Sequence, residues 1–163
     1  MMKYLITIVL ITFLSTATMA KEIKTEILIN ATPTKVWSIL TNFDNYPNWN
    51  PFIKYIKGNV KVGNKLSMKI APPQASEMTF KPRVLTYETN KELSWQGHLL
   101  FPGLFDGAHK FELIDNGNGT TTLKQSEKFK GIMVPLFKKL LDNNTKRGFE
   151  EMNQKLKELA EGK

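Results

Sequence analysis

The sequence predicts an α+β domain, in which a curved antiparallel sheet of about seven strands wraps around one long C-terminal helix. Two observations support this class. Short segments with alternating apolar residues and turn signals between them fill most of the chain, which indicates antiparallel strands. The last segment repeats its apolar residues at helical spacing, which indicates a late helix with one buried face.

The first elements are a strand and two short helices. Residues 22–30 alternate, and the side chains on one face are Ile23, Thr25, Ile27 and Ile29. Thr32 is a candidate N-cap and Pro33 occupies the first helical position, so a helix is expected there. Residues 43–51 are expected to form a short second helix or loop.

Six antiparallel strands and the long helix follow. The predicted strands are 52–57 (with 60–62 across a turn), 65–71, 78–87, 93–99, 108–114 and 121–129. The last two form a hairpin around the turn residues 116–119. The helix is expected to run from Pro135 to about Glu161. Gly148 in its middle indicates a bend, a close approach of a strand or a tolerated glycine.

Residues 1–20 have the three regions of a secretory signal peptide. Lys3 supplies a positive start, Tyr4–Leu14 is apolar, and small residues lead to Ala20. The apolar run is shorter than the roughly 20 residues that span a bilayer. We therefore expect cleavage after Ala20, one domain over residues 21–163, and a periplasmic or secreted protein. An uncleaved membrane anchor is the alternative.

Composition excludes several kinds of chemistry. The chain has no cysteine, which excludes disulfides, thiolate metal sites and cysteine nucleophiles. Its two histidines, His98 and His109, lack a zinc-binding spacing, and no phosphate-binding loop or serine elbow occurs. We expect a monomer with no metal and no cofactor.

Five segments together resemble a known superfamily. They are 29–33 with 36–37 (INATP and VW), 43–52 (FDNYPNWNPF), 93–95 (LSW), 103–113 (GLFDGAHKFEL) and 127–131 (EKFKG). The chain resembles the START-like, helix-grip superfamily (also called SRPBCC), and in particular small bacterial proteins of the polyketide cyclase/dehydratase type. The resemblance covers nearly all of residues 21–163 and implies the helix-grip fold. It implies less about function, since members include lipid carriers, hormone receptors and cyclases.

Strand alternation selects the residues that face the interior. In 93–99 the odd-numbered positions place Trp95 inside, and Arg83 shares that face if the neighbouring strand pairs odd with odd. His98 has the opposite parity and is expected at the surface. Alignment of two leucines across the next hairpin gives the facing pairs Leu113–Leu123, Phe111–Gln125 and His109–Glu127.

The pair His109–Glu127 is the sharpest chemical feature of the sequence. A buried histidine and carboxylate can share a proton, polarise a carbonyl or move a proton in a dehydration or cyclisation. Two other interpretations remain open: the pair orients a polar group of a ligand, or it only organises the strands.

Two connections are unusually apolar. Residues 99–105 and 132–137 are rich in large apolar side chains, although most connections are polar. If both segments lie at one end of the sheet, they form an apolar mouth for a cavity; the alternative is that they fold inward and fill the core.

Basic residues accumulate in one region. Between Asp44 and Glu77 there is no acid, and the lysines there are Lys54, Lys57, Lys61, Lys65 and Lys69. This lysine-rich edge could approach an anionic membrane surface, or it could simply be a solvated strand edge. Export makes nucleic acid a poor partner, and none is expected.

These observations lead to one main hypothesis and two alternatives. The protein is expected to bind a hydrophobic small molecule or lipid in a cavity between the sheet and the last helix. The first alternative is a cyclase or dehydratase with His109 and Glu127 as acid and base. The second is that side chains fill the cavity and the protein acts through its basic surface alone. The candidate ligand-binding residues are Arg83, Trp95, Phe101, Phe105, His109, Phe111, Leu113, Glu127, Met133, Phe137 and Leu141.

Overall fold

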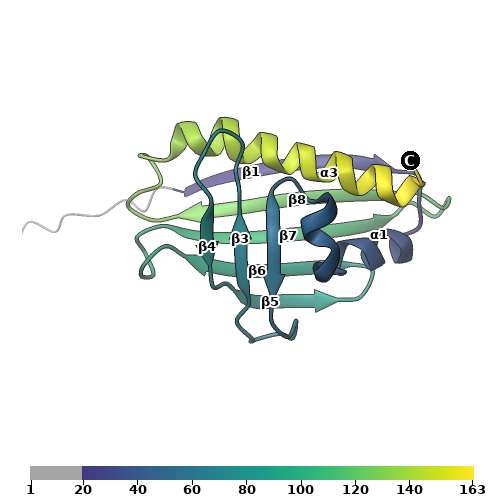
Figure 1. The fold of residues 1–163 in the computed structure, drawn as a ribbon, viewed down its shortest axis with the longest axis horizontal. Coiled ribbons are helices and arrows are strands. Elements are labelled where there is room, and N and C mark those ends of the chain that lie inside the picture. Colours follow the sequence, from purple (N-terminus) through teal and green to yellow (C-terminus); the bar gives the residue numbers. More distant parts are fainter. Residues whose placement is uncertain (1–19) are drawn as a thin grey trace, which may run out of the picture.

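A computed structural model describes residues 20–163, so the predicted signal peptide up to residue 19 lies outside the described residues. Within them, strands form two antiparallel sheets, and helices connect and cover the sheets (Figure 1). The strands are β1 (Ala20–Ile29), β2 (Ile53–Lys57), β3 (Ser67–Ile70), β4 (Met78–Phe80), β5 (Arg83–Glu88), β6 (Glu92–His98), β7 (Asp106–Asp115) and β8 (Thr121–Lys130). The helices are α1 (Pro33–Leu40), the 3-10 helix η1 (Phe43–Asn45), α2 (Tyr46–Trp49), the π-helix η2 (Leu140–Thr145) and α3 (Lys146–Glu161).

The two sheets differ in size and direction. The larger has the strand order β1-β8-β7-β6-β5 and the smaller has the order β2-β3-β4. Figure 1 shows the strands of the smaller sheet running across those of the larger one, with α3 alongside β1. The predicted α+β helix-grip fold is confirmed, with eight described strands divided between two sheets.

The predicted strand 78–87 is two strands, because the chain changes sheets at Pro82. Proline has no N–H to give to a ladder, and the Pro82 carbonyl accepts a hydrogen bond from the Leu66 amide at 2.8 Å. β4 therefore pairs with β3, whereas β5 pairs with β6. The predicted short strand 60–62 is irregular backbone that leads into a turn.

The first helix begins where the sequence predicts, and the last helix does not. Thr32 caps α1, since its Oγ1 accepts a hydrogen bond from the Lys35 amide at 3.4 Å. The prediction that the last helix starts at Pro135 is wrong: Pro135 lies in a turn, and η2 precedes α3. Gly148 of α3 is a close-approach site, because the ring of Phe52 occupies the space that a Cβ would need.

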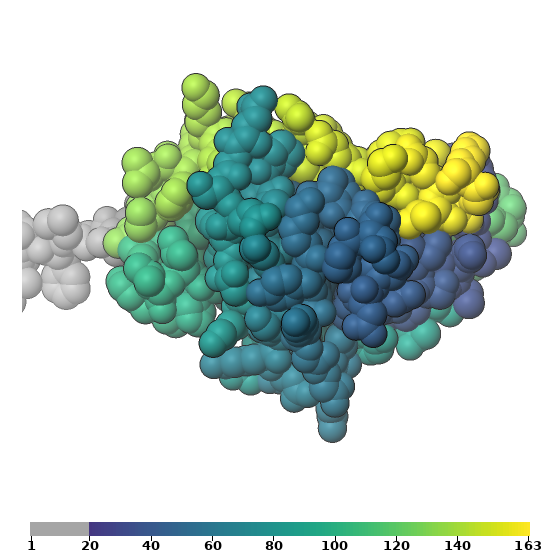
Figure 2. Space-filling model, viewed as in Figure 1, coloured from purple at the N-terminus to yellow at the C-terminus, as the bar shows by residue number. Residues whose placement is uncertain are grey.

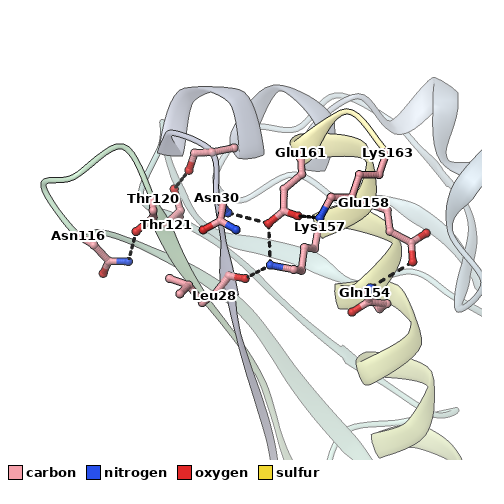
Figure 3. Close-up of polar contacts among 11 residues, drawn as sticks. Leu28, Asn30, Asn116, Thr120, Thr121, Gln154, Lys157, Glu158, Glu161 and Lys163 are labelled. Carbon is pink, nitrogen blue, oxygen red and sulfur yellow. Dashed lines mark hydrogen bonds and ion pairs between the residues drawn. The ribbon is translucent and has the colours of Figure 1, made fainter.

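Glu161 fixes the end of α3 to the end of β1 (Figure 3). Its Oε1 accepts hydrogen bonds from the Asn30 amide at 2.9 Å and from Nζ of Lys157 at 2.6 Å, and Lys157 also donates to the Leu28 carbonyl. Nζ of Lys163 donates to Oε2 at 2.8 Å. These donors, Lys157 first, lower the pKa of Glu161 from its ordinary value of 4.5 to about 2.

One apolar core joins both sheets to α1 and α3. Its fully buried members include Ile29 of β1, Leu40 of α1, Phe111 of β7 and Phe149 of α3. No helix within residues 20–163 is long and apolar enough to cross a membrane.

Candidate functional site

A cavity of about 100 Å³ lies between the two sheets and the start of the C-terminal helix. Most of its wall is apolar, and the aromatic residues in it are Phe52, Phe80, Trp95, Phe105, Phe129 and Phe137. The polar side chains at the wall are those of His98, His109, Glu127 and Thr145. The cavity is thus an apolar space with few polar groups, as small-molecule sites usually are.

The structure places six of the predicted ligand-binding residues at this cavity. They are Trp95, Phe105, His109, Glu127, Phe137 and Leu141. They come from β6, the β6–β7 connection, β7, β8 and the segment that enters α3. The predicted register of the β7–β8 hairpin is confirmed, including His109 opposite Glu127.

The prediction that Arg83 faces the interior is wrong. Arg83 is exposed, and its guanidinium donates to the backbone carbonyl of Gly63. The pairing of β5 with β6 shifts between Val84 and Thr86, a bulge that leaves Leu85 unpaired. Val84 therefore lies opposite Trp95 and is buried, so the odd-with-odd assumption fails before the bulge.

Four other predicted residues lie outside the cavity wall. Phe111 and Leu113 belong to the packed core, and the Phe111 ring packs against the rings of Trp95 and His109. Phe101 is 57% exposed. Met133 is half-buried in the connection before α3, where its amide bonds to the Leu104 carbonyl.

His109 and Glu127 form a hydrogen-bonded pair at the wall. Nδ1 of His109 lies 3.4 Å from Oε2 of Glu127, and the amide nitrogen of Gln125 lies 3.2 Å from Nε2 of His109. Because the amide of Gln125 donates, Nε2 accepts, and Nδ1 carries the proton that His109 donates to Glu127. Oε1 of Glu127 has no hydrogen-bonding partner among residues 20–163.

Aromatic packing holds the imidazole in place. His109 is buried and stacks on Trp95, with ring centroids 5.1 Å apart and planes 9° from parallel. The ring of Phe149 meets it edge-on at 5.0 Å. The imidazole is therefore a fixed support for the carboxylate, and Glu127 is the more accessible partner of the two.

Gly107 makes room for the carboxylate. A Cβ at this position would come within 2.5 Å of Oε1 of Glu127. Gly107 faces Gly97 across the β6–β7 ladder, and both glycines line the cavity. The absence of side chains at these two positions thus shapes the space in front of Glu127.

Several residues of the site are not predicted by the sequence. Gln125 was predicted on the interior face as the partner of Phe111, but its contact with His109 is diagonal and was not foreseen. Gly107 has the same parity as His109, a signal that was available in the alternation. No sequence pattern predicts that residues of the smaller sheet line the cavity, because strand alternation does not show how that sheet packs onto the larger one. No group of three metal-ligating side chains occurs in the described part of the chain.

Comparison with known proteins identifies the family. Residues 20–161 match the family described as "Polyketide cyclase / dehydrase and lipid transport". The match covers most of the chain, and the protein belongs to this family. No curated protein matches the chain.

Solved structures share the fold at low sequence identity. Norcoclaurine synthase from Thalictrum flavum, in complex with dopamine and hydroxybenzaldehyde, has a TM-score of 0.67 at 16% identity over 87% of each chain. A Staphylococcus aureus protein of unknown function has a TM-score of 0.67 at 17% identity, over 90% of this chain and 96% of that one. The di-domain ARO/CYC protein BexL of the BE-7585A biosynthetic pathway has a TM-score of 0.71 at 11% identity. The alignment covers 88% of this chain and 51% of BexL. At these identities the likeness establishes the fold.

Proposed function

We propose that this protein binds a small apolar molecule that carries a hydrogen-bond donor, and that Glu127 receives that donor. One observation carries the proposal: Glu127 lies at the wall of a mostly apolar, aromatic cavity, and one oxygen of its carboxylate accepts no hydrogen bond from residues 20–163. An ionised carboxylate only accepts hydrogen bonds. The complementary ligand group is therefore a hydroxyl or an amine.

The volume of the cavity favours a small ligand over a lipid. At about 100 Å³ it is smaller than an engineered cavity of roughly 150 Å³ that takes up benzene. A one-ring molecule fits with a small adjustment of the wall, whereas a lipid chain requires much more space. One structure of this fold, norcoclaurine synthase, is a complex with dopamine and hydroxybenzaldehyde, which guides the choice of a phenol as the probe.

The test compares phenol with benzene, which differ by one hydroxyl. Protein NMR titration, followed at the Trp95 indole, gives both dissociation constants. A hydrogen bond to a charged acceptor contributes about 1.5–3 kcal/mol, so phenol is expected to bind roughly 10- to 150-fold more tightly than benzene. In Glu127→Leu this preference should vanish, while Glu26→Gln on the outer side of β1 should keep it. Equal affinities in the wild type would contradict the proposal.

A second candidate is an enzyme of the cyclase or dehydratase type. It is favoured by the pairing of the Glu127 carboxylate with the protonated Nδ1 of His109 at the cavity wall. With acetophenone as a probe in D2O, a base at Glu127 would accelerate exchange of the α-protons, and Glu127→Gln would abolish that acceleration. If the protein binds phenol but does not accelerate exchange of the acetophenone α-protons, the result supports a binding protein and contradicts the enzyme hypothesis.

We also propose that the protein is exported, as residues 1–20 predict. The proposal is supported by the order of features in that segment, in which a positive charge is followed by an apolar run and then by small residues. N-terminal sequencing of protein recovered from the exported fraction should begin at Lys21. A chain that retains residues 1–20 in the membrane fraction would assign this segment to an anchor.

A further inference from the structure

The two apolar connections form one surface at the cavity end of the molecule. The Ile132 amide bonds to the Gly103 carbonyl at 3.2 Å, and the Met133 amide bonds to the Leu104 carbonyl at 3.0 Å. Gly131 permits this approach, because a Cβ there would lie 2.5 Å from the Leu104 carbonyl oxygen. Figure 2 shows the two segments together at the left end, in the teal-green of residues near 100 and the yellow-green of residues near 135.

Large apolar side chains project from this surface into solvent. The exposed fractions are 79% for Leu100, 74% for Leu136, 61% for Ile132 and 57% for Phe101. Leu100 has φ of 60°, a left-handed backbone conformation that bulky residues rarely adopt. Here that strained conformation accompanies an apolar side chain that is held outward. We name the surface formed by these four side chains the loop face.

Exposed lysines flank the residues of the loop face along the chain. From Lys128 to Leu141 the chain carries four lysines and no acid. Lys130, Lys138 and Lys139 are exposed, and none of the three forms an ion pair with another residue in the range 20–163. An apolar centre with a rim of lysines complements a bilayer that has an apolar interior and anionic headgroups.

The start of the described chain lies at the same end. Ala20 pairs with Lys130, which pairs with Asp106 on its other side. The apolar run Tyr4–Leu14 precedes Ala20 in the sequence and lies outside the described residues. The described part of the chain therefore begins beside the loop face.

We infer that the loop face docks on the surface of lipid bilayers that contain anionic lipids. The inference deepens the proposed function and rests on it in one respect: Leu99, Phe105 and Phe137 of the same connections line the cavity, so docking would bring the cavity to the lipid surface. The docking itself depends only on the exposed side chains and the lysines.

Vesicle sedimentation of the full chain tests the inference. The vesicles contain phosphatidylcholine alone or with three-tenths phosphatidylglycerol. The variant Leu100→Glu with Leu136→Glu should lower the fraction bound to anionic vesicles at least fivefold. Val62→Glu with Leu28→Glu, which replaces two side chains that are 56% and 51% exposed in other parts of the surface, is the matched control and should bind as the wild type does. The melting temperatures of all variants confirm that they fold.

A second pair of variants separates the loop face from the lysine-rich edge. Lys138→Glu with Lys139→Glu should weaken binding to anionic vesicles about as strongly, whereas Lys57→Glu with Lys61→Glu should not. Loss of binding in the edge variant alone would overturn the inference, as would unchanged binding of both loop-face variants.

The oligomeric state and the phenol titration of the variants test the inference further. If the wild type sediments as a dimer that Leu100→Glu with Leu136→Glu converts to a monomer, the loop face belongs to a second copy of the chain and the inference is wrong. Phenol titration without vesicles should be unchanged in every surface variant. If the wild type binds phenol but does not bind anionic vesicles, only the loop-face inference is wrong. If the wild type binds anionic vesicles but does not bind phenol, only the proposed function is wrong.

Discussion

Across the β7–β8 ladder, Nδ1 of His109 lies 3.4 Å from Oε2 of Glu127. The imidazole is buried and stacked, whereas the carboxylate has an oxygen without a protein partner among the described residues. The two groups therefore have different tasks: His109 positions Glu127, and Glu127 meets whatever enters the cavity.

This division of tasks predicts the tautomer of His109. Because the Gln125 amide nitrogen faces Nε2, neutral His109 should carry its proton on Nδ1. Two-bond ¹H–¹⁵N correlation spectra of the imidazole distinguish the two nitrogens directly. In Gln125→Leu the donor to Nε2 is lost, and we expect an unfolding free energy lower by about 1–3 kcal/mol. A proton on Nε2 in the wild type would contradict this account, because the amide oxygen of Gln125, and not its nitrogen, would then have to face Nε2.

The sequence was sufficient to predict the β7–β8 hairpin. Turn residues at 116–119 set its position, and alignment of Leu113 with Leu123 then determines every facing pair, because alternation has a fixed period of two. The strand β5 shows the limit of this argument. A bulge near Leu85 changes the parity within one strand, and no residue type there marks it, so Arg83 was assigned to the wrong face.

The rest of the site depends on long-range packing. Pro82 sends the chain from one sheet to the other, and the cavity exists only because the smaller sheet then lies over Trp95 and Glu127. The apolar connections were predicted to meet at one end, and they do. Some of their side chains turn inward, as Phe105 does, and others remain exposed. Strand alternation does not describe the contacts that decide between these two positions.

Gly107→Ala should weaken ligand binding without much loss of stability. The new Cβ would come within 2.5 Å of Oε1 of Glu127 and displace the carboxylate from its position at the wall. We expect phenol to bind about tenfold more weakly, equivalent to roughly 1.4 kcal/mol. Gly97→Ala is the matched control, since its Cβ would make an ordinary 3.4 Å contact with Pro82. If both substitutions change the phenol dissociation constant equally, the prediction that Gly107 leaves room for the Glu127 carboxylate is wrong.

Gly148→Ala should destabilise the protein, although alanine is the better helix former. Helix propensity alone predicts a gain of about 1 kcal/mol. The ring of Phe52 fills the space next to Gly148, and overpacking of a core typically costs about 1–3 kcal/mol. Urea denaturation should therefore show a lower midpoint for Gly148→Ala. The added substitution Phe52→Leu should recover part of that loss, and a higher midpoint for Gly148→Ala alone would show that the contact is not tight.

The contact of Glu161 with β1 predicts a pH dependence of stability. Its pKa is about 2 in the folded protein and near 4.5 when the chain is unfolded, because Lys157, Lys163 and the Asn30 amide stabilise the ionised form. The stabilisation is fully present above pH 4.5 and is lost as the pH falls toward 2. Glu161→Gln should lower stability at pH 7, and its difference from the wild type should shrink across this range in urea titrations. Glu150→Gln, whose carboxylate lies 3.8 Å from Nζ of Lys146 at the surface, should show little change at either pH. A difference between Glu161→Gln and the wild type that stays constant from pH 7 to pH 2 would mean that the charge of Glu161 does not hold α3 to β1.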